Sequence, residues 1–188
     1  LVAYELIKNE ISIELKEKWL KTIKIWIYFL ISSEETHAFI SNHLATAAAA
    51  LLRWSIVEKK TSLGDKAFQH GRKIIRKILD NQSCNDFFYK EYDGPDPGYQ
   101  SLCINYLTDA FLTIEKIGLI SDSLKDELMI SLNKSIIYLS YFFHPDGSFG
   151  GMYGSRNTRF FSPGGLEYMS KNDPNSYALT NRIKESLK

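Results

Sequence analysis

A run of small residues at positions 41–52 constrains this chain more than any other stretch. It reads SNHLATAAAALL, with apolar residues at helical spacing and four consecutive alanines. Alanine is the best helix former, and its lack of bulk lets neighbouring backbones approach closely. The run therefore predicts a helix inside an assembly of helices. Asn42 and His43 begin it, where free N–H groups and the helix dipole favour a bound anion. The structural alternative is a capping asparagine beside a histidine whose hydrogen bonds are satisfied within the protein.

The rest of the chain also has the three- and four-residue apolar spacing of helices, broken by turn-forming residues. A chain of 188 residues suits one sizeable domain, and we expect residues 1–188 to form a single all-α domain. The predicted helices cover residues 1–31, 34–58 with a break near 41, 64–81, 99–117, 121–143 and 176–188. The third of these carries a basic cluster, which we interpret as a solvated face: Arg72, Lys73, Arg76 and Lys77. His37 and His70 lie among polar neighbours and are predicted to be surface residues.

The connections between these helices alternate in length. Short turns occur near residues 32, 61 and 120, and long glycine-rich, aromatic loops cover 82–98 and 144–175. Consecutive antiparallel helices place alternate connections at opposite ends of a bundle, so both long loops and the start of the alanine-rich helix are expected at one end. Long loops gathered at one end of a scaffold commonly carry function. The polar residues expected to meet there are Asn42, His43, Asp93, Asp96, Tyr99, Gln100, Arg156, Asn157, Arg159 and Glu167.

Residues 64–98 and 121–175 each read as a helix, a long loop and a new helix. Helical hairpins repeated in this way build solenoids or closed α/α toroids. A closed ring of six hairpins needs roughly twice this length, at about 40 to 50 residues per hairpin. We therefore expect an incomplete ring of antiparallel hairpins. Because the chain begins with Leu1 and reads as helix at once, we also expect it to be part of a longer polypeptide whose remaining domains complete the ring.

Composition limits the partners of the chain. The net charge of +1 gives no electrostatic argument for nucleic acid or for a membrane surface. The longest apolar run, residues 23–31, is too short to span a bilayer. No metal or cofactor is expected, because histidine and the acidic residues show no ligand spacing. Cys84 and Cys103 fit no metal or redox motif, and a disulfide between them is conceivable in an exported protein. No targeting segment is visible, which leaves bacterial cytoplasm, periplasm and export all open.

Two motifs resemble those of known families. Asn42-His43 leading an alanine- and leucine-rich helix resembles the Asn-His segment of α/α-toroid polysaccharide lyases of the heparinase II/III and alginate lyase type. In those families an Asp-Gly pair precedes the tyrosine that opens a helix and acts in catalysis, and residues 93–99 are similar, with Tyr99 at the matching place. The chain departs from the family at Gln100, where a histidine is usual close to that tyrosine.

The turn PDGSFGG at residues 145–151 also resembles the Asp-Gly-x-Phe-Gly turns of terpene cyclases and prenyltransferases. Those proteins are α/α toroids too. This second likeness supports the fold and not a shared substrate.

The lyase resemblance implies β-elimination on a uronic-acid-containing polysaccharide, without a metal. Tyr99 would remove the C5 proton and return it to the leaving oxygen, while Asn42 and His43 neutralise the sugar carboxylate. Nearby positive charge would have to lower the pKa of that tyrosine. Residues expected to bind the polysaccharide are Arg156, Arg159, Asn157, Gln100, Asp96 and Glu167.

Other interpretations stay open at this point. A toroidal glycoside hydrolase would use two facing carboxylates, Asp93 or Asp96 with Glu167. A non-enzymatic α/α domain would bind glycan or hold another domain of a longer chain. Tyr99 can equally be a packed aromatic, and the arginines can tie down their own loop. Five loop aromatics can stack on sugar rings or anchor the loops to the core: Tyr89, Tyr92, Tyr153, Phe160 and Phe161.

Overall fold

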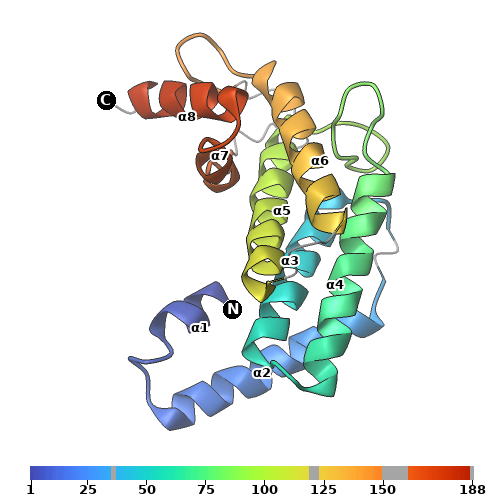
Figure 1. The fold of residues 1–188 in the computed structure, drawn as a ribbon, viewed down its shortest axis with the longest axis vertical. Helices are drawn as coiled ribbons and strands as arrows, with labels where there is room; N and C mark the ends of the chain where they lie inside the picture. The colour runs from blue at the N-terminus through green and yellow to red at the C-terminus, as the bar shows by residue number, and fades with distance from the viewer. Residues whose placement is uncertain (35–36, 119–122, 150–160, 187–188) are drawn as a thin grey trace.

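A computed structural model describes residues 1–34, 37–118, 123–149 and 161–186, and within these ranges the chain is helical without any strand (Figure 1). The predicted all-α class is thus confirmed. The helices are α1 (Val2–Ile7), α2 (Ile13–Ser32), α3 (Ser41–Val57), α4 (Ser62–Asp80), α5 (Pro97–Ile117), α6 (Ser123–Ser140), α7 (Gly164–Met169) and α8 (Pro174–Ser186).

Helix α3, which contains the alanine run, is the central helix and packs against both α4 and α5. Its side chains supply much of the core, and Leu51, Leu52 and Trp54 are fully buried. Small residues let α4 approach it closely. A Cβ atom added at Gly71 of α4 would lie 3.0 Å from the Leu52 Cγ and 3.3 Å from the Ala48 carbonyl oxygen. The run therefore has the interior position that its lack of bulk predicts.

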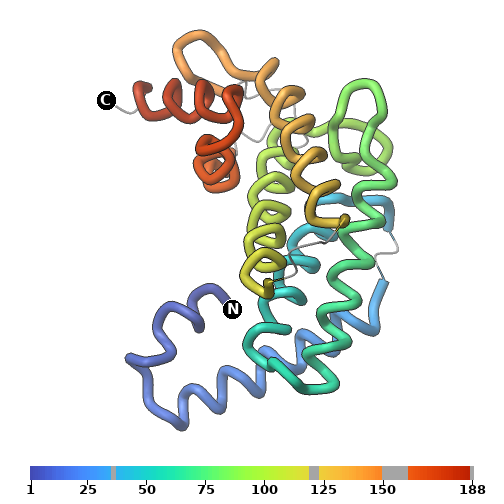
Figure 2. Tube along the Cα trace, in the orientation of Figure 1, coloured from blue at the N-terminus to red at the C-terminus, as the bar shows by residue number. Residues whose placement is uncertain are grey.

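The helices alternate in direction, so that α3 and α5 begin, and α4 and α6 end, at the same end of the bundle (Figures 1 and 2). We call this end, made by residues 40–43, 89–101 and 161–163, the loop end. Hydrogen bonds join its segments. The Ser41 N–H and hydroxyl both donate to the Lys90 carbonyl, at 3.1 and 2.7 Å. The Ser162 N–H donates to the Ser101 hydroxyl at 2.9 Å.

Three predicted segments are wrong. Residues 37–40 lie in the predicted helix 34–58 but are not helical, and α3 begins at Ser41. Residues 1–31 do not form one helix, because the chain turns after α1 and the Ser12 hydroxyl caps α2 by accepting the Leu15 N–H at 3.2 Å. On α2 Ile27 is buried, while Leu20, Ile23, Leu30 and Ile31 are partly buried against the core. The interval 144–175 is not one long loop, since it contains α7. This short helix packs on α5 so closely that a Cβ atom at Gly165 would lie 2.9 Å from the Asn105 backbone.

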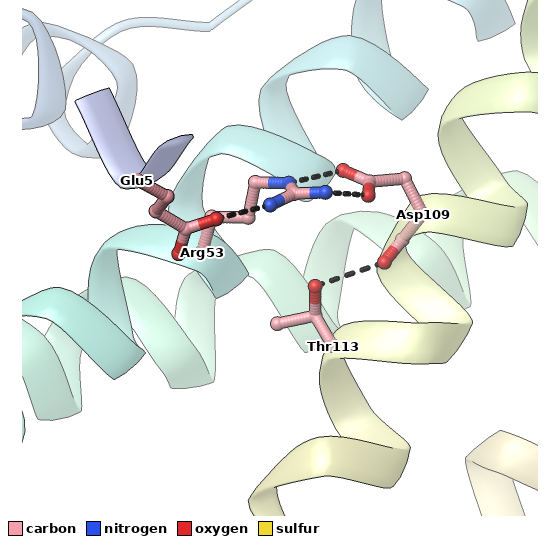
Figure 3. A network of polar contacts seen from close by, with 4 residues as sticks. All are labelled: Glu5, Arg53, Asp109 and Thr113. Atoms are coloured by element: carbon pink, nitrogen blue, oxygen red, sulfur yellow. Dashed lines mark hydrogen bonds and ion pairs between the residues drawn. The ribbon is translucent and has the colours of Figure 1, made fainter. Parts of the chain in front are cut away.

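A charged network ties α1 to the bundle (Figure 3). The Arg53 guanidinium of α3 contacts both carboxylate oxygens of Asp109 on α5, with Nε donating to Oδ2 at 2.6 Å, and it also pairs with Glu5 of α1. Thr113 donates to the Asp109 carbonyl at 2.9 Å. The hydrogen bond with Asp109, which outweighs the opposing effect of burial, raises the pKa of Arg53 above its ordinary value. One half-buried cation therefore holds three helices together.

Replacing Arg53 with methionine should reduce the free energy of unfolding by about 2 kcal/mol, because two half-buried carboxylates lose their shared partner. Urea denaturation followed by circular dichroism measures this. Arg76→Met is the matched control, since Arg76 pairs with Glu127 in the same two-pronged way at a more exposed site. The control should lose less stability. Equal losses in the two variants would contradict the structural role given to Arg53.

Candidate functional site

The start of α3 is held by a carboxyl group from a distant part of the chain. The Asn42 backbone N–H donates to Glu91 Oε1 at 2.8 Å, and the Asn42 side-chain Nδ2 donates to Glu91 Oε2 at 2.6 Å. The residue preceding the helix, Ile40, makes no side-chain cap of its own and instead forms an antiparallel bridge with Glu91. Glu91 therefore caps α3 from outside the helix and also fixes the orientation of the Asn42 amide.

Burial makes the Glu91 carboxyl a weaker acid than an ordinary glutamate. Glu91 is only 5% exposed. Burial, aided by the negative charge of Asp96, raises its pKa to about 7, although the two hydrogen bonds from Asn42 and the charge of His43 act in the opposite direction. A carboxyl group with a pKa near neutrality can both give and take a proton at physiological pH. The group formed by Asn42, His43, Glu91 and Asp96 is named the Glu91 cluster below.

The backbone beside this cluster is strained. Glu91 and Gly94 exchange two backbone hydrogen bonds, of 2.8 and 3.2 Å, which close a tight turn. Tyr92, the second residue of that turn, has a φ of 60°, which is rare for a bulky aromatic residue. Such strain concentrates at functional sites. The turn leaves the Tyr92 side chain half-exposed directly beside the buried Glu91.

The start of α5 lies at the same end of the bundle. Asp96 is buried and caps α5, its Oδ1 accepting the Tyr99 N–H at 3.1 Å. Tyr99 follows in the first turn and is partly exposed. Gln100 is fully buried, and its Oε1 accepts the Tyr89 N–H at 2.9 Å. The Gln100 Nε2 has no hydrogen-bond partner in the described part of the chain. Gln100 thus holds the loop before α5 with one end of its amide and leaves a buried donor at the other.

The remaining predicted site residues differ in their placement. Glu167 is on α7, exposed, with its Oε1 3.0 Å from the Lys184 Nζ of α8. Asp93 is exposed in the tight turn after Tyr92. Arg156, Asn157 and Arg159 fall outside the described residues.

Some aromatic side chains of the loops anchor them to the core, and one is exposed. Tyr89 is fully buried, and its hydroxyl lies 2.7 Å from the Ser131 hydroxyl on α6, so it anchors the loop. Phe161 packs against Phe143 with ring centroids 5.1 Å apart, which is also an anchoring contact. Tyr92 is the exposed one of the three that are described, while Tyr153 and Phe160 lie outside the described residues.

Metal and cysteine chemistry add little to the site. No group of three or more histidine, cysteine, aspartate and glutamate side chains that could hold a metal ion occurs in the described ranges. Cys84 is exposed and Cys103 buried, and the two are not bonded to each other. Burial, with a contribution from the charge of Glu91, raises the pKa of the Cys103 thiol. Among the helices that the structure describes, none has the length and apolar character needed to cross a bilayer.

Glu91 is the functional candidate that sequence reasoning missed. It directly precedes the Tyr-Asp-Gly turn, so its position beside a predicted motif was the one available signal. Its partner Asn42 is 49 residues away, and neither its burial nor that pairing leaves a local pattern.

Comparisons with known proteins add no assignment: no family model, curated protein or solved structure matches this chain.

Proposed function

We propose that this chain is part of a carbohydrate-active enzyme that cleaves a uronic-acid-containing polysaccharide by β-elimination. The observation that carries the proposal is the Glu91–Asn42 pair. It fixes a hydrogen-bond donor at the start of the central helix, beside His43, while Tyr99 opens the parallel helix α5 at the same end. A fixed donor beside a separate proton carrier is what elimination next to a carboxylate requires.

In the proposed reaction the Tyr99 side-chain oxygen acts as the base and takes the proton from C5 of the uronic acid. The electrons of the broken C5–H bond form a C4=C5 double bond, the C4–O bond breaks, and the departing oxygen receives the proton from Tyr99. Negative charge builds on the sugar carboxylate as the C5 proton leaves. Asn42 and His43 stabilise that charge, and the Glu91 contact occupies only one of the two N–H groups on the Asn42 amide nitrogen.

The helix arrangement supports an arc of an α/α toroid as the setting for this chemistry. The helices α3 and α5 run parallel and side by side, while α4 and α6 return in the opposite direction (Figure 1). One such hairpin is the repeating unit of a toroid, and two follow in succession here. The long loops of an arc would form the rim of a polysaccharide cleft.

A second candidate, glycoside hydrolysis, is favoured by one observation. Glu91 and Asp96 are both buried, and the charge of Asp96 helps to raise the pKa of Glu91. Hydrolysis of a glycosidic bond needs two carboxyl groups, one of which must stay protonated near neutral pH to act as the acid. The sequence alone pairs Asp93 or Asp96 with Glu167 for this role. The hydrolysis candidate uses Glu91 and Asp96 instead, because Glu167 pairs with Lys184.

The two candidates differ in their products. The protein is incubated with alginate, heparan sulfate, hyaluronan and pectate, and both ultraviolet absorbance and reducing-end release are followed. Elimination is expected to give new reducing ends together with the absorbance of the conjugated C4=C5 double bond. Reducing ends without that absorbance would replace elimination with hydrolysis. Neither signal across the panel, from protein shown to be folded by circular dichroism, would overturn both candidates.

A further inference from the structure

A cavity of about 650 Å³ lies beside the Glu91 cluster, between the end of α2, the first half of α3 and the second half of α4. It is continuous with the cluster through two residues. His43 lines the cavity and follows Asn42, and Tyr92 lines it and follows Glu91. Its volume is within the range of small-molecule binding sites, about 300 to 1,000 Å³. A ligand held at the cluster therefore has room to extend into this cavity.

The wall that α4 contributes is basic. His70, Lys73 and Lys77 succeed one another at three- and four-residue spacing, so they lie along one face of the helix and line the cavity. Burial, with the charge of Lys73, lowers the pKa of His70, while Glu34 acts in the opposite direction. Glu34 is the carboxylate among the lining residues, so two lysines outnumber it at neutral pH. The cavity therefore favours an anionic group.

The basic cluster that the sequence assigns to a solvated face is divided by the fold. Arg72 lies over the Phe68 ring at 5.4 Å, and Arg76 pairs with Glu127 of α6. Lys73 and Lys77 instead face the cavity. Arg72 and Arg76 are thus engaged within the protein. The two lysines line the cavity, and the Lys77 Nζ also lies 5.9 Å from the centroid of the Phe39 ring.

The remaining lining suits a ring with an apolar face. The floor is aliphatic, with Leu44, Ala47 and Ile74. Phe29 and Tyr92 line the cavity as well and are 54% and 52% exposed, so their faces are accessible. Aromatic side chains with apolar bodies beside charged groups combine ring packing with recognition of a charged substituent.

We propose that this cavity binds an acidic sugar residue of the polysaccharide, next to the residue held at the Glu91 cluster. Its carboxylate or sulfate group contacts Lys73 and Lys77, and its ring packs against Tyr92. The inference rests on the proposed function for the identity of the polymer, but it concerns binding, so it can be tested without turnover.

The test is calorimetric titration at low salt with three short probes: an alginate oligosaccharide, a heparan sulfate oligosaccharide and a neutral cellulose oligosaccharide. The double variant Lys73→Gln/Lys77→Gln should raise the Kd for an acidic probe by about tenfold or more, because two charge-assisted contacts are lost. Lys21→Gln/Lys24→Gln is the matched control. It makes the same charge change at exposed positions on α2 outside the cavity lining, and should leave the Kd within about twofold. Comparing alginate with heparan sulfate separates the carboxylate from the sulfate as the preferred group.

Two outcomes would overturn the inference. One is an equal Kd for an acidic probe in the two double variants. The other is binding of the neutral probe as tight as that of the acidic probes. Its failure is distinct from that of the proposed function. If an acidic probe binds in a lysine-dependent way but no unsaturated product forms, the β-elimination proposal is rejected and the binding site in the cavity is retained. If the Lys73→Gln/Lys77→Gln variant forms unsaturated product with an unchanged KM, the cavity does not bind the polysaccharide, and the β-elimination proposal is unaffected.

Discussion

Tyr99→Phe should lower the rate of unsaturated-product formation by about a hundredfold or more, since a positioned proton carrier contributes on the order of 10² to 10⁴ in rate. Phenylalanine keeps the ring but lacks the oxygen that carries the proton. The Tyr99 contact with Asp96 uses its backbone N–H, so the cap of α5 is retained in the variant. The kcat should therefore fall while polysaccharide affinity is preserved. Initial rates by ultraviolet absorbance and Kd by calorimetry measure the two effects separately.

Tyr106→Phe is the matched control. Tyr106 is partly buried on the same helix, two turns further from the loop end, and its substitution removes the same atom. Its kcat should stay within about twofold of the original, because its hydroxyl has no part in the proposed proton transfer. An undiminished rate of unsaturated-product formation in Tyr99→Phe would contradict the role given to Tyr99. Reducing-end release without unsaturated product, kept in Tyr99→Phe and lost in Glu91→Gln, would instead favour hydrolysis by the Glu91 and Asp96 pair.

The second large effect concerns stability and pH at Glu91. Its pKa is about 7 in the folded protein, against 4.5 for an ordinary glutamate, so the folded state holds this proton more tightly than the unfolded state. The free energy of unfolding should therefore decrease as pH rises through this interval and become level above about pH 7. At 1.36 kcal/mol per pKa unit, the loss attributable to Glu91 is about 3 kcal/mol.

Other carboxyl groups titrate in the same range, so the measurement is a comparison with Glu91→Gln. Glutamine has the same shape, and its oxygen can still accept the Asn42 N–H. Urea unfolding of both proteins is followed at several pH values from about 4 to 8. The stability of Glu91→Gln relative to the original protein should rise across this range. A difference independent of pH would show that the Glu91 carboxyl titrates normally, and would remove it as a proton carrier near neutrality.

Much of the helical framework could be predicted, because its signals are local. Gly118 ends α5 in the left-handed conformation, with a φ of 85°, as a glycine after the last apolar residue predicts. The count of helices then places the starts of α3 and α5 together. The prediction of the helices failed where a short segment depends on tertiary contacts. The break before α2 depends on one serine cap, and α7 is a six-residue helix that depends on packing against α5.

The site was predictable only in part, for the same physical reason. Helix parity was enough to expect Asn42, His43, Asp96 and Tyr99 at one end of the bundle. It could not identify Glu91, because a buried carboxyl is recognised by its surroundings and not by its neighbours in sequence. Nor could it divide the basic residues of α4, since only the packed helices decide that Lys73 faces a cavity while Arg76 pairs with Glu127.

The cap that Glu91 provides to α3 also has a consequence for the order of folding. A helix normally begins with a cap from an adjacent residue, so its first turn can form early. Here the cap comes from 49 residues further along the chain, after the whole of α4. The first turn of α3 therefore gains its full stability only when that long segment has closed, which costs loop entropy in the transition state. We therefore expect the first turn of α3 to become stable only after α4 has packed against α3.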